Sequence, residues 1–210
     1  MSYRKARRYE NLERRIFKGV GKFDIPQIQP VSYKGRYEWI GFNYASSCKT
    51  GSLGKGIHFF LDDYQFKRLW TDIDRYIPLF QRFGYVMSPD FSTYTDYPVA
   101  MQIYNHYRKH WIGAYLQDEG IQIIPTISWG EVKSFEWCFD GEPSGGTVAI
   151  SSVGCMNSAH RKALFIRGWQ EMMRCLEPEL IIWHGEVPEE CQGNILKIET
   201  FQKKFNMKMR

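Results

Sequence analysis

The sequence lacks the features of membrane proteins and of disulfide-rich secreted domains. Its 210 residues contain no run of about 18 apolar residues. The N-terminal stretch MSYRKARRYENLERR has basic residues with no apolar segment behind them, unlike a signal peptide. The five cysteines are widely spaced and form no CxxC pair, which argues against a disulfide framework and a zinc knuckle. We therefore expect a cytoplasmic protein with reduced thiols and no membrane contact.

A nucleotide-binding loop is also absent, although KTGSLGKG (49–56) is similar to one. A Walker loop has the spacing GxxxxGK[ST] and lies between a strand and a helix. Here the glycine spacing is shorter, Gly56 replaces the hydroxyl residue, and the pattern predicts that a strand follows. We interpret the stretch as a connector whose Lys49 and Lys55 can touch a phosphate backbone.

The positive charge is concentrated at the two ends of the chain. Residues 1–22 carry eight basic and two acidic side chains, an excess larger than the net charge of +5. The last 20 residues are also basic. Basic ends on a nearly neutral body indicate a polyanionic partner, most often nucleic acid. The alternative is a solvated basic helix that only improves solubility.

Short apolar runs alternate with helical patterns along the rest of the chain. Runs of this length, separated by amphipathic helices, are typical of parallel strands buried on both faces. The six runs are 37–45, 57–63, 85–92, 121–129, 147–154 and 180–186. The helical patterns cover 64–84, 98–120 and 157–178, and Pro78 can break the first of them.

This alternation predicts an α/β fold with a mainly parallel sheet of about six βα units. We expect an incomplete TIM-like barrel, and the alternative is an open doubly wound sheet. The α/β domain is expected over residues 34–190. Residues 1–33 are predicted to form a basic N-terminal helical arm with a linker, and 191–210 a basic C-terminal helix or tail.

Acidic residues and a histidine follow the predicted strands, where parallel βα folds collect their functional groups. They are Asp62, Asp63, Asp90 and His184. Such a group is a candidate catalytic site for a phosphodiester, in which Asp62 and Asp90 would hold Mg²⁺ or Mn²⁺. The alternative is that the aspartates cap the elements that follow them.

Residues that can contact a nucleic acid or protein partner lie in the arm, on one helix and after one strand. The arm residues fall at helical spacing, as in basic helices that bind a phosphate backbone. The helix residues flank an aromatic stripe that is predicted to be core. The full set is Arg4, Lys5, Arg7, Arg8, Arg15, Lys18, Asn105, Arg108, Ser128 and Trp129.

His106 and His110 are four residues apart, the spacing at which two histidines of a helix can share a metal ion. No glutamate accompanies them, and the neighbouring Arg108 and Lys109 would oppose a cation. The sequence therefore favours a solvated helix face at this position. Cys155 is predicted to be a small buried thiol, because no nucleophile motif surrounds it.

Several segments resemble a family of prophage and plasmid proteins of Gram-positive bacteria, described as a domain of unknown function. The resemblance covers about residues 37–186 and leaves out the basic ends. It implies a mobile genetic element acting in a bacterial host, but no catalytic residues. The segments that carry it are FLDDYQF, RYIPLFQRFG, MSPDFSTYTDYPVAMQIYNHYR, IPTISW and FDGEPSGGTVAISSVGC.

Three hypotheses follow for the function. The first is a counter-defence protein of anti-CRISPR type that binds a host RNA-guided nuclease or its nucleic acid through the basic arm. The second is a metal-dependent phosphodiesterase acting on RNA or DNA at the strand-end carboxylates. The third is an accessory factor for replication or transfer of the element. The charge asymmetry favours the first, and the sequence leaves the oligomeric state open.

Overall fold

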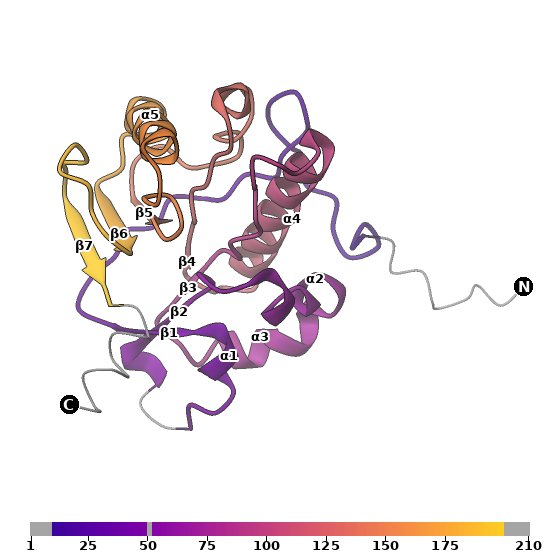
Figure 1. The fold of residues 1–210 in the computed structure, drawn as a ribbon. Coiled ribbons are helices and arrows are strands. Elements are labelled where there is room, and N and C mark those ends of the chain that lie inside the picture. The colour runs from indigo at the N-terminus through magenta and orange to yellow at the C-terminus, as the bar shows by residue number, and fades with distance from the viewer. Residues whose placement is uncertain (1–9, 50–51, 200–210) are drawn as a thin grey trace, which may run out of the picture.

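The structure, a computed structural model, describes residues 10–49 and 52–199. Within these ranges the chain forms two parallel sheets (Figure 1), which confirms the α/β class. The first sheet contains β1 (Glu38–Gly41), β2 (Lys55–His58), β3 (Tyr85–Met87) and β4 (Ile123–Ile124). The second contains β5 (Thr147–Ser151), β6 (Leu180–His184) and β7 (Ile195–Ile198).

The two sheets are joined just beyond β4, where Thr126 makes a parallel bridge to Ala149 of β5. The strands thus follow one another in chain order, without the reversal that defines a doubly wound sheet. The rings of His58 on β2 and His184 on β6 are 5.6 Å apart, although four strand spacings of a flat sheet span about 19 Å. The sheet is therefore strongly curved. No pairing closes it into a barrel among the described residues.

Two long helices connect strands. α4 (Val99–Asp118) begins directly after Pro98, and α5 (Ala159–Leu176) is capped by Ser158, whose hydroxyl accepts from the Arg161 amide at 3.2 Å. Glu177 ends α5 in the left-handed conformation, with φ of 44°. The remaining helices have one turn each: α1 (Phe42–Ala45), α2 (Arg68–Thr71) and α3 (Ile77–Phe80).

The helix expected over 64–84 is interrupted before Pro78, the expected point of a break, as well as near it. The segment forms α2, α3 and the 3₁₀ turns η2 (Asp63–Gln65) and η3 (Ile73–Tyr76). One cause is tertiary, because the Trp70 carbonyl accepts from the side-chain amide of Asn11 at 2.6 Å. Asn11 is buried there, and the carbonyl is diverted from continuing the helix.

The N-terminal segment, residues 10–33, lies along α4 in Figure 1 and contains no helix, so the helical arm is not found in this part. The Arg15 carbonyl accepts from the Trp111 indole at 2.9 Å, and Gln29 exchanges two hydrogen bonds with Gln117. Ile28 is fully buried. Contacts with α4 thus hold the segment in an irregular path. Of the predicted arm face, Arg4, Lys5, Arg7 and Arg8 lie outside the described residues.

The apolar interior consists of two clusters. One fills the space among β1–β4 and α1–α4 and extends to Ala149, Ile182 and Ile198 of the second sheet. The other lies between the β5–β6 pair and α5. In the second, the Trp129 indole covers Gly168 so closely that an added Cβ would lie 2.1 Å from its nitrogen. No helix in the described part of the chain is long and apolar enough to cross a membrane.

The C-terminal part adds one strand that the sequence pattern did not reveal. β7 pairs in parallel with β6 over four residues, from Ile195 opposite Ile181 to Ile198 opposite His184. The pattern ILKI is short and its middle residues are exposed, so it lacks the buried apolar run that marks the other strands. The sheet extends beyond the expected limit at residue 190.

Replacing Ile28 with alanine should lower the free energy of unfolding by about 2–5 kcal/mol, because it leaves a cavity beneath the N-terminal segment. Ile16 of the same segment is 75% exposed, and Ile16→Ala should change stability by less than about 0.5 kcal/mol. Urea unfolding of both variants measures this. Equal, small effects would show that the segment is not packed on α4.

Candidate functional site

The strand-end residues lie at or after the carboxyl ends of parallel strands, and each has its own set of contacts. Asp62 is exposed and makes no side-chain cap. The Asp63 carboxylate accepts from the backbone amide and the hydroxyl of Ser92, the latter at 2.8 Å. Asp63 therefore fastens the loop after β2 to the loop after β3, which is the structural role that aspartates often have at such positions.

Asp90 is the acidic residue with the most perturbed environment. Burial raises the pKa of its carboxyl to about 7, although the positive charge of Lys109 lowers it, and the charge of Asp63 adds to the increase. A carboxyl group with this pKa is partly protonated at neutral pH. It can give or take a proton there, but it is a weak anchor for Mg²⁺.

His184 ends β6 among aromatic rings. Its ring stacks on Phe60 at 4.9 Å with an interplanar angle of 15°, and its Nδ1 is 3.1 Å from the Ser151 hydroxyl. Burial lowers the pKa of His184 to about 4, so the imidazole is neutral at physiological pH. No hydrogen bond or ion pair within the described residues connects His184 with Asp62, Asp63 or Asp90.

The predicted contact residues of α4 are engaged in the scaffold. Asn105 is buried, and its side-chain amide donates to the Ser92 carbonyl at 2.6 Å. The Arg108 guanidinium donates to Asn105 and lies over the Phe91 ring, 4.1 Å from its centroid. This arrangement holds the loop after β3 against α4.

The other predicted contact residues differ in exposure. Trp129 and Ser128 are both partly exposed, and Trp129 packs against Phe165 and Gly168 of α5. Arg15 is exposed and pairs with Asp118 at 3.4 Å. Lys18 is exposed, and no carboxylate pairs with it among residues 10–49 and 52–199.

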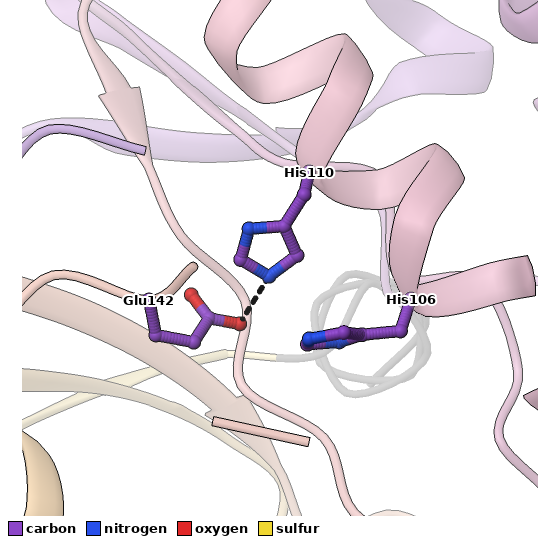
Figure 2. Close-up of side chains that lie close together, drawn as sticks. All are labelled: His106, His110 and Glu142. Carbon is purple, nitrogen blue, oxygen red and sulfur yellow. Dashed lines mark hydrogen bonds and ion pairs between the residues drawn. The ribbon is translucent and has the colours of Figure 1, made fainter. Parts of the chain in front are cut away.

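His106 and His110 are buried, so the solvated helix face predicted for them is wrong (Figure 2). The N-terminal segment and the chain around Glu142 cover this face of α4. His110 Nε2 lies 2.9 Å from Glu142 Oε1, and His110 Nδ1 lies 2.9 Å from the Pro26 carbonyl oxygen. His106 Nε2 is 2.9 Å from the Asp140 carbonyl oxygen.

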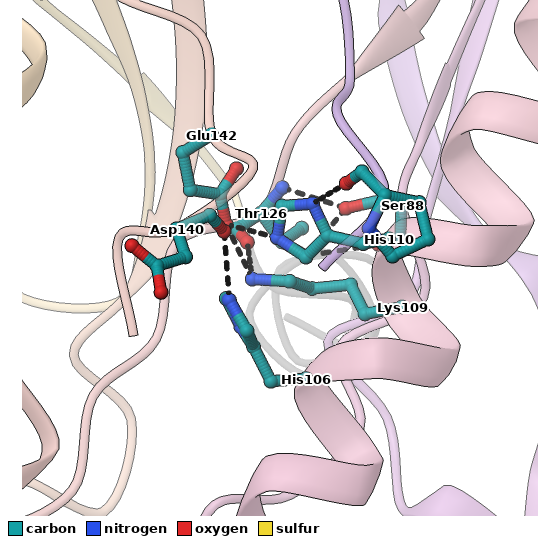
Figure 3. Close-up of polar contacts among 8 residues, drawn as sticks. Ser88, His106, Lys109, His110, Thr126, Asp140 and Glu142 are labelled. Carbon is teal, nitrogen blue, oxygen red and sulfur yellow. Dashed lines mark hydrogen bonds and ion pairs between the residues drawn. The ribbon is translucent and has the colours of Figure 1, made fainter. Parts of the chain in front are cut away.

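Lys109 joins the same buried cluster (Figure 3). Its ammonium group donates to Glu142 Oε1 at 2.6 Å and to the Thr126 carbonyl at 2.8 Å. The Thr126 hydroxyl in turn is 2.9 Å from the hydroxyl of Ser88. The cluster therefore runs from α4 across the end of β4 to the residue that follows β3.

The charges of the buried cluster balance one another. Burial alone would raise the pKa of Glu142, but Lys109 and His110 outweigh it, so the pKa is lowered. Burial lowers the pKa of His110 despite Glu142 beside it, and that of His106 falls well below its usual range. Glu142 is thus ionised and His106 is neutral at pH 7.

This buried cluster is the place where the structure can hold a metal ion. His106, His110 and Glu142 each offer a ligand atom within 4.8 Å of the others, the one such group found among the described residues. The four-residue histidine spacing was visible in the sequence. Glu142 was not, because it lies 32 residues beyond His110 and only the fold brings it close.

Similarity to known proteins extends over most of the chain. A family profile described as "Domain of unknown function (DUF4417)" matches residues 17–202. The chain is similar to the Gene 1 protein of Mycobacterium phage D29, 37% identical over 175 residues, which is 83% of this chain and 64% of that protein. It is also similar to the Gene 1 protein of Mycobacterium phage L5, 36% identical over 174 residues, or 83% and 76% of the two chains. The chain thus spans slightly less than two thirds of the D29 protein. No solved structure matches it.

Replacing Lys109 with methionine should lower the free energy of unfolding by about 3–5 kcal/mol, because the change leaves the Glu142 carboxylate buried without its ammonium partner. The double variant Lys109→Met/Glu142→Gln should recover much of that decrease, since both charges are gone. Chemical denaturation of the variants measures the coupling. Lys162→Met, which removes an exposed pair with Glu190, is the control and should leave the unfolding midpoint unchanged. If the effects of Lys109→Met and of Glu142→Gln alone add up to that of the double variant, the two residues are not a coupled pair.

Asp90 should make the protein less stable as pH rises. Its pKa is raised to about 7, so the folded protein keeps a proton that the unfolded chain releases near pH 4. Stability should therefore fall between pH 4 and 7. Asp90→Asn removes this ionisation. The free energy of unfolding of the variant, relative to that of the wild type, should therefore increase from pH 4 to 7 and stay constant above pH 7. Thermal unfolding at each pH tests this, with the exposed Asp96→Asn as control. A constant difference from pH 4 to 8 would refute it.

Proposed function

We propose that this chain, which belongs to the DUF4417 family, binds nucleic acid or a nucleoprotein complex through the basic side chains of residues 1–22. The observation that carries the proposal is the charge of residues 1–22, attached to an α/β domain that is nearly neutral. A concentrated positive charge attracts phosphate backbones and speeds the encounter with them.

The anchoring of residues 10–33 on α4 supports this role. Trp111 and Ile28 hold the segment against the helix, so the preceding basic residues start from a fixed point on the domain. Lys18 and Lys22 are exposed, and neither pairs with a carboxylate in the described part of the chain. A fixed starting point lowers the entropy that the segment loses on binding.

The phage relatives support a counter-defence role. Both similar proteins carry mycobacteriophage names. A phage protein with a polyanion-binding segment is suited to a host complex that presents nucleic acid, and an RNA-guided nuclease is such a complex. We therefore propose inhibition of a host nuclease of this kind in the bacterial cytoplasm as the most specific form of the function.

The proposal is tested by replacing Arg4, Lys5, Arg7, Arg8 and Lys18 with alanine. Affinity for mixed-sequence RNA and DNA oligonucleotides should fall. The plot of log affinity against log salt concentration should become shallower by about one unit for each phosphate group that the variant no longer neutralises. Fluorescence anisotropy across a salt series measures both quantities.

The control replaces Lys133 and Arg167, which are exposed basic residues outside the N-terminal segment. This variant should keep the affinity and the salt dependence of the wild type. Decreases in proportion to the number of charges removed, five in the first variant and two in the control, would show that binding depends only on net charge. Unchanged binding in the first variant would remove the segment from the function.

A second candidate is a phosphodiesterase, favoured by one observation, the pKa of about 7 of Asp90. A carboxyl group with this pKa suits general acid and base catalysis at neutral pH. Cleavage of RNA or DNA that disappears in folded Asp90→Asn would favour this candidate over the binding role.

A further inference from the structure

We propose that His106, His110 and Glu142 form a buried binding site for one transition-metal ion of the zinc class. Two histidines and one carboxylate are a donor set that zinc and other imidazole-binding metals use. The argument rests on which atoms of the three side chains have hydrogen-bond partners and which do not.

Each histidine has one ring nitrogen committed to a backbone carbonyl. His106 Nε2 faces the Asp140 oxygen and His110 Nδ1 faces the Pro26 oxygen, both at 2.9 Å. A carbonyl oxygen only accepts, so these nitrogens must carry the protons. In the neutral imidazoles, the lone pairs then lie on His106 Nδ1 and His110 Nε2. Metal-binding histidines are commonly fixed by such a hydrogen bond from their other nitrogen.

Two of the remaining donor atoms have no partner. His106 Nδ1 and Glu142 Oε2 are buried and make no hydrogen bond within the described residues. The three side chains are almost completely buried, with residue exposures of 1% for His106, 0% for His110 and 6% for Glu142. Buried polar atoms without a partner are uncommon and carry a free-energy cost, which a bound cation would remove.

The lone pair of His110 Nε2 faces an acceptor, Glu142 Oε1. His110 Nε2 and Glu142 Oε1 lie 2.9 Å apart, and a bare imidazole nitrogen and a carboxylate oxygen repel each other unless a proton or a metal lies between them. Ligand atoms of a tetrahedral zinc ion are about 3.4 Å apart, as follows from metal bonds of about 2.1 Å. An opening of about half an ångström would admit the ion. One ligand atom from each of the three side chains already lies within 4.8 Å of the others.

The donor atoms beside Lys109 favour a zinc-class ion over Mg²⁺ or Ca²⁺. Its ammonium group already neutralises Glu142 through Oε1, and Oε2 has no such partner. Mg²⁺ and Ca²⁺ need several oxygen ligands, and a single neutralised carboxylate does not supply them. Zinc-class ions bind imidazole nitrogen well, so two histidines can hold them beside a lysine.

The test measures metal in the full-length protein. Protein is unfolded in guanidinium with EDTA and then refolded with Zn²⁺, Co²⁺ or Mg²⁺. Mass spectrometry should find about one Zn²⁺ or Co²⁺ per folded chain and no retained Mg²⁺. The Co²⁺ form should show the visible absorption of a four-coordinate site. A folded wild type that retains neither Zn²⁺ nor Co²⁺ would overturn the proposal.

Variants locate the site. His106→Gln and His110→Gln should each lose most of the bound Zn²⁺ and its stabilising effect on thermal unfolding. His160→Gln, at an exposed histidine of α5, is the matched control and should bind as the wild type does. Full binding by folded His106→Gln and His110→Gln would refute the site. The bound Zn²⁺ would then have to lie elsewhere, and the neighbouring rings of His58 and His184 would be the next site to test.

A measurement on the wild type covers the case in which the variants do not fold. Two-dimensional ¹H–¹⁵N spectra of the imidazoles report which nitrogen carries the lone pair. His106 Nδ1 and His110 Nε2 should shift when Zn²⁺ is present. Shifts confined to His58, His160 or His184 would contradict the proposal. A His110 ring protonated at both nitrogens with and without Zn²⁺ would show that a proton, and not a metal, bridges it to Glu142.

Discussion

The buried ammonium group of Lys109 is the constraint around which the centre of the molecule is arranged. A charge removed from water costs several kcal/mol unless it is paired and hydrogen-bonded. Lys109 meets this requirement with Glu142 and with the carbonyl of Thr126. Because Glu142 also contacts His110, and His110 contacts Pro26, one charge ties α4 to the end of β4, to the loop before β5 and to the N-terminal segment.

The buried imidazole and carboxylate groups of the cluster are thus separated from the basic side chains at the surface. Inside, the imidazole and carboxylate groups lie almost out of contact with solvent, where they can hold a small ion but cannot reach a macromolecule. Outside, the basic residues of the N-terminal segment are attached to the same helix. The cluster fixes the segment, through Pro26, to the helix that carries His110.

The fold class could be predicted because the β5 and β6 strands are continuous apolar runs that only parallel sheets bury on both faces. The incomplete TIM-like barrel expected from the βα repeat implies a curved sheet, but the degree of curvature depends on contacts such as that of His58 with His184, which are 126 positions apart. The hydrogen bond from Asn11 to the Trp70 carbonyl had no local signal either, since the two residues are 59 positions apart. The spacing of His106 and His110 in the sequence predicted part of the candidate site. Glu142 could not be predicted, because it lies in the loop before β5 and only the fold brings it to the histidines.

The parallel α/β class, the positions of most strands, the two long helices and the excess of positive charge at the ends follow from the amino-acid sequence. They depend on local periodicity and composition, which each segment carries with it. The burial of His106 and His110 depends on contacts between distant segments. A helix face is solvated or covered according to what packs on it, and here the covering residues, Pro26 and Glu142, lie on either side of the helix in the chain.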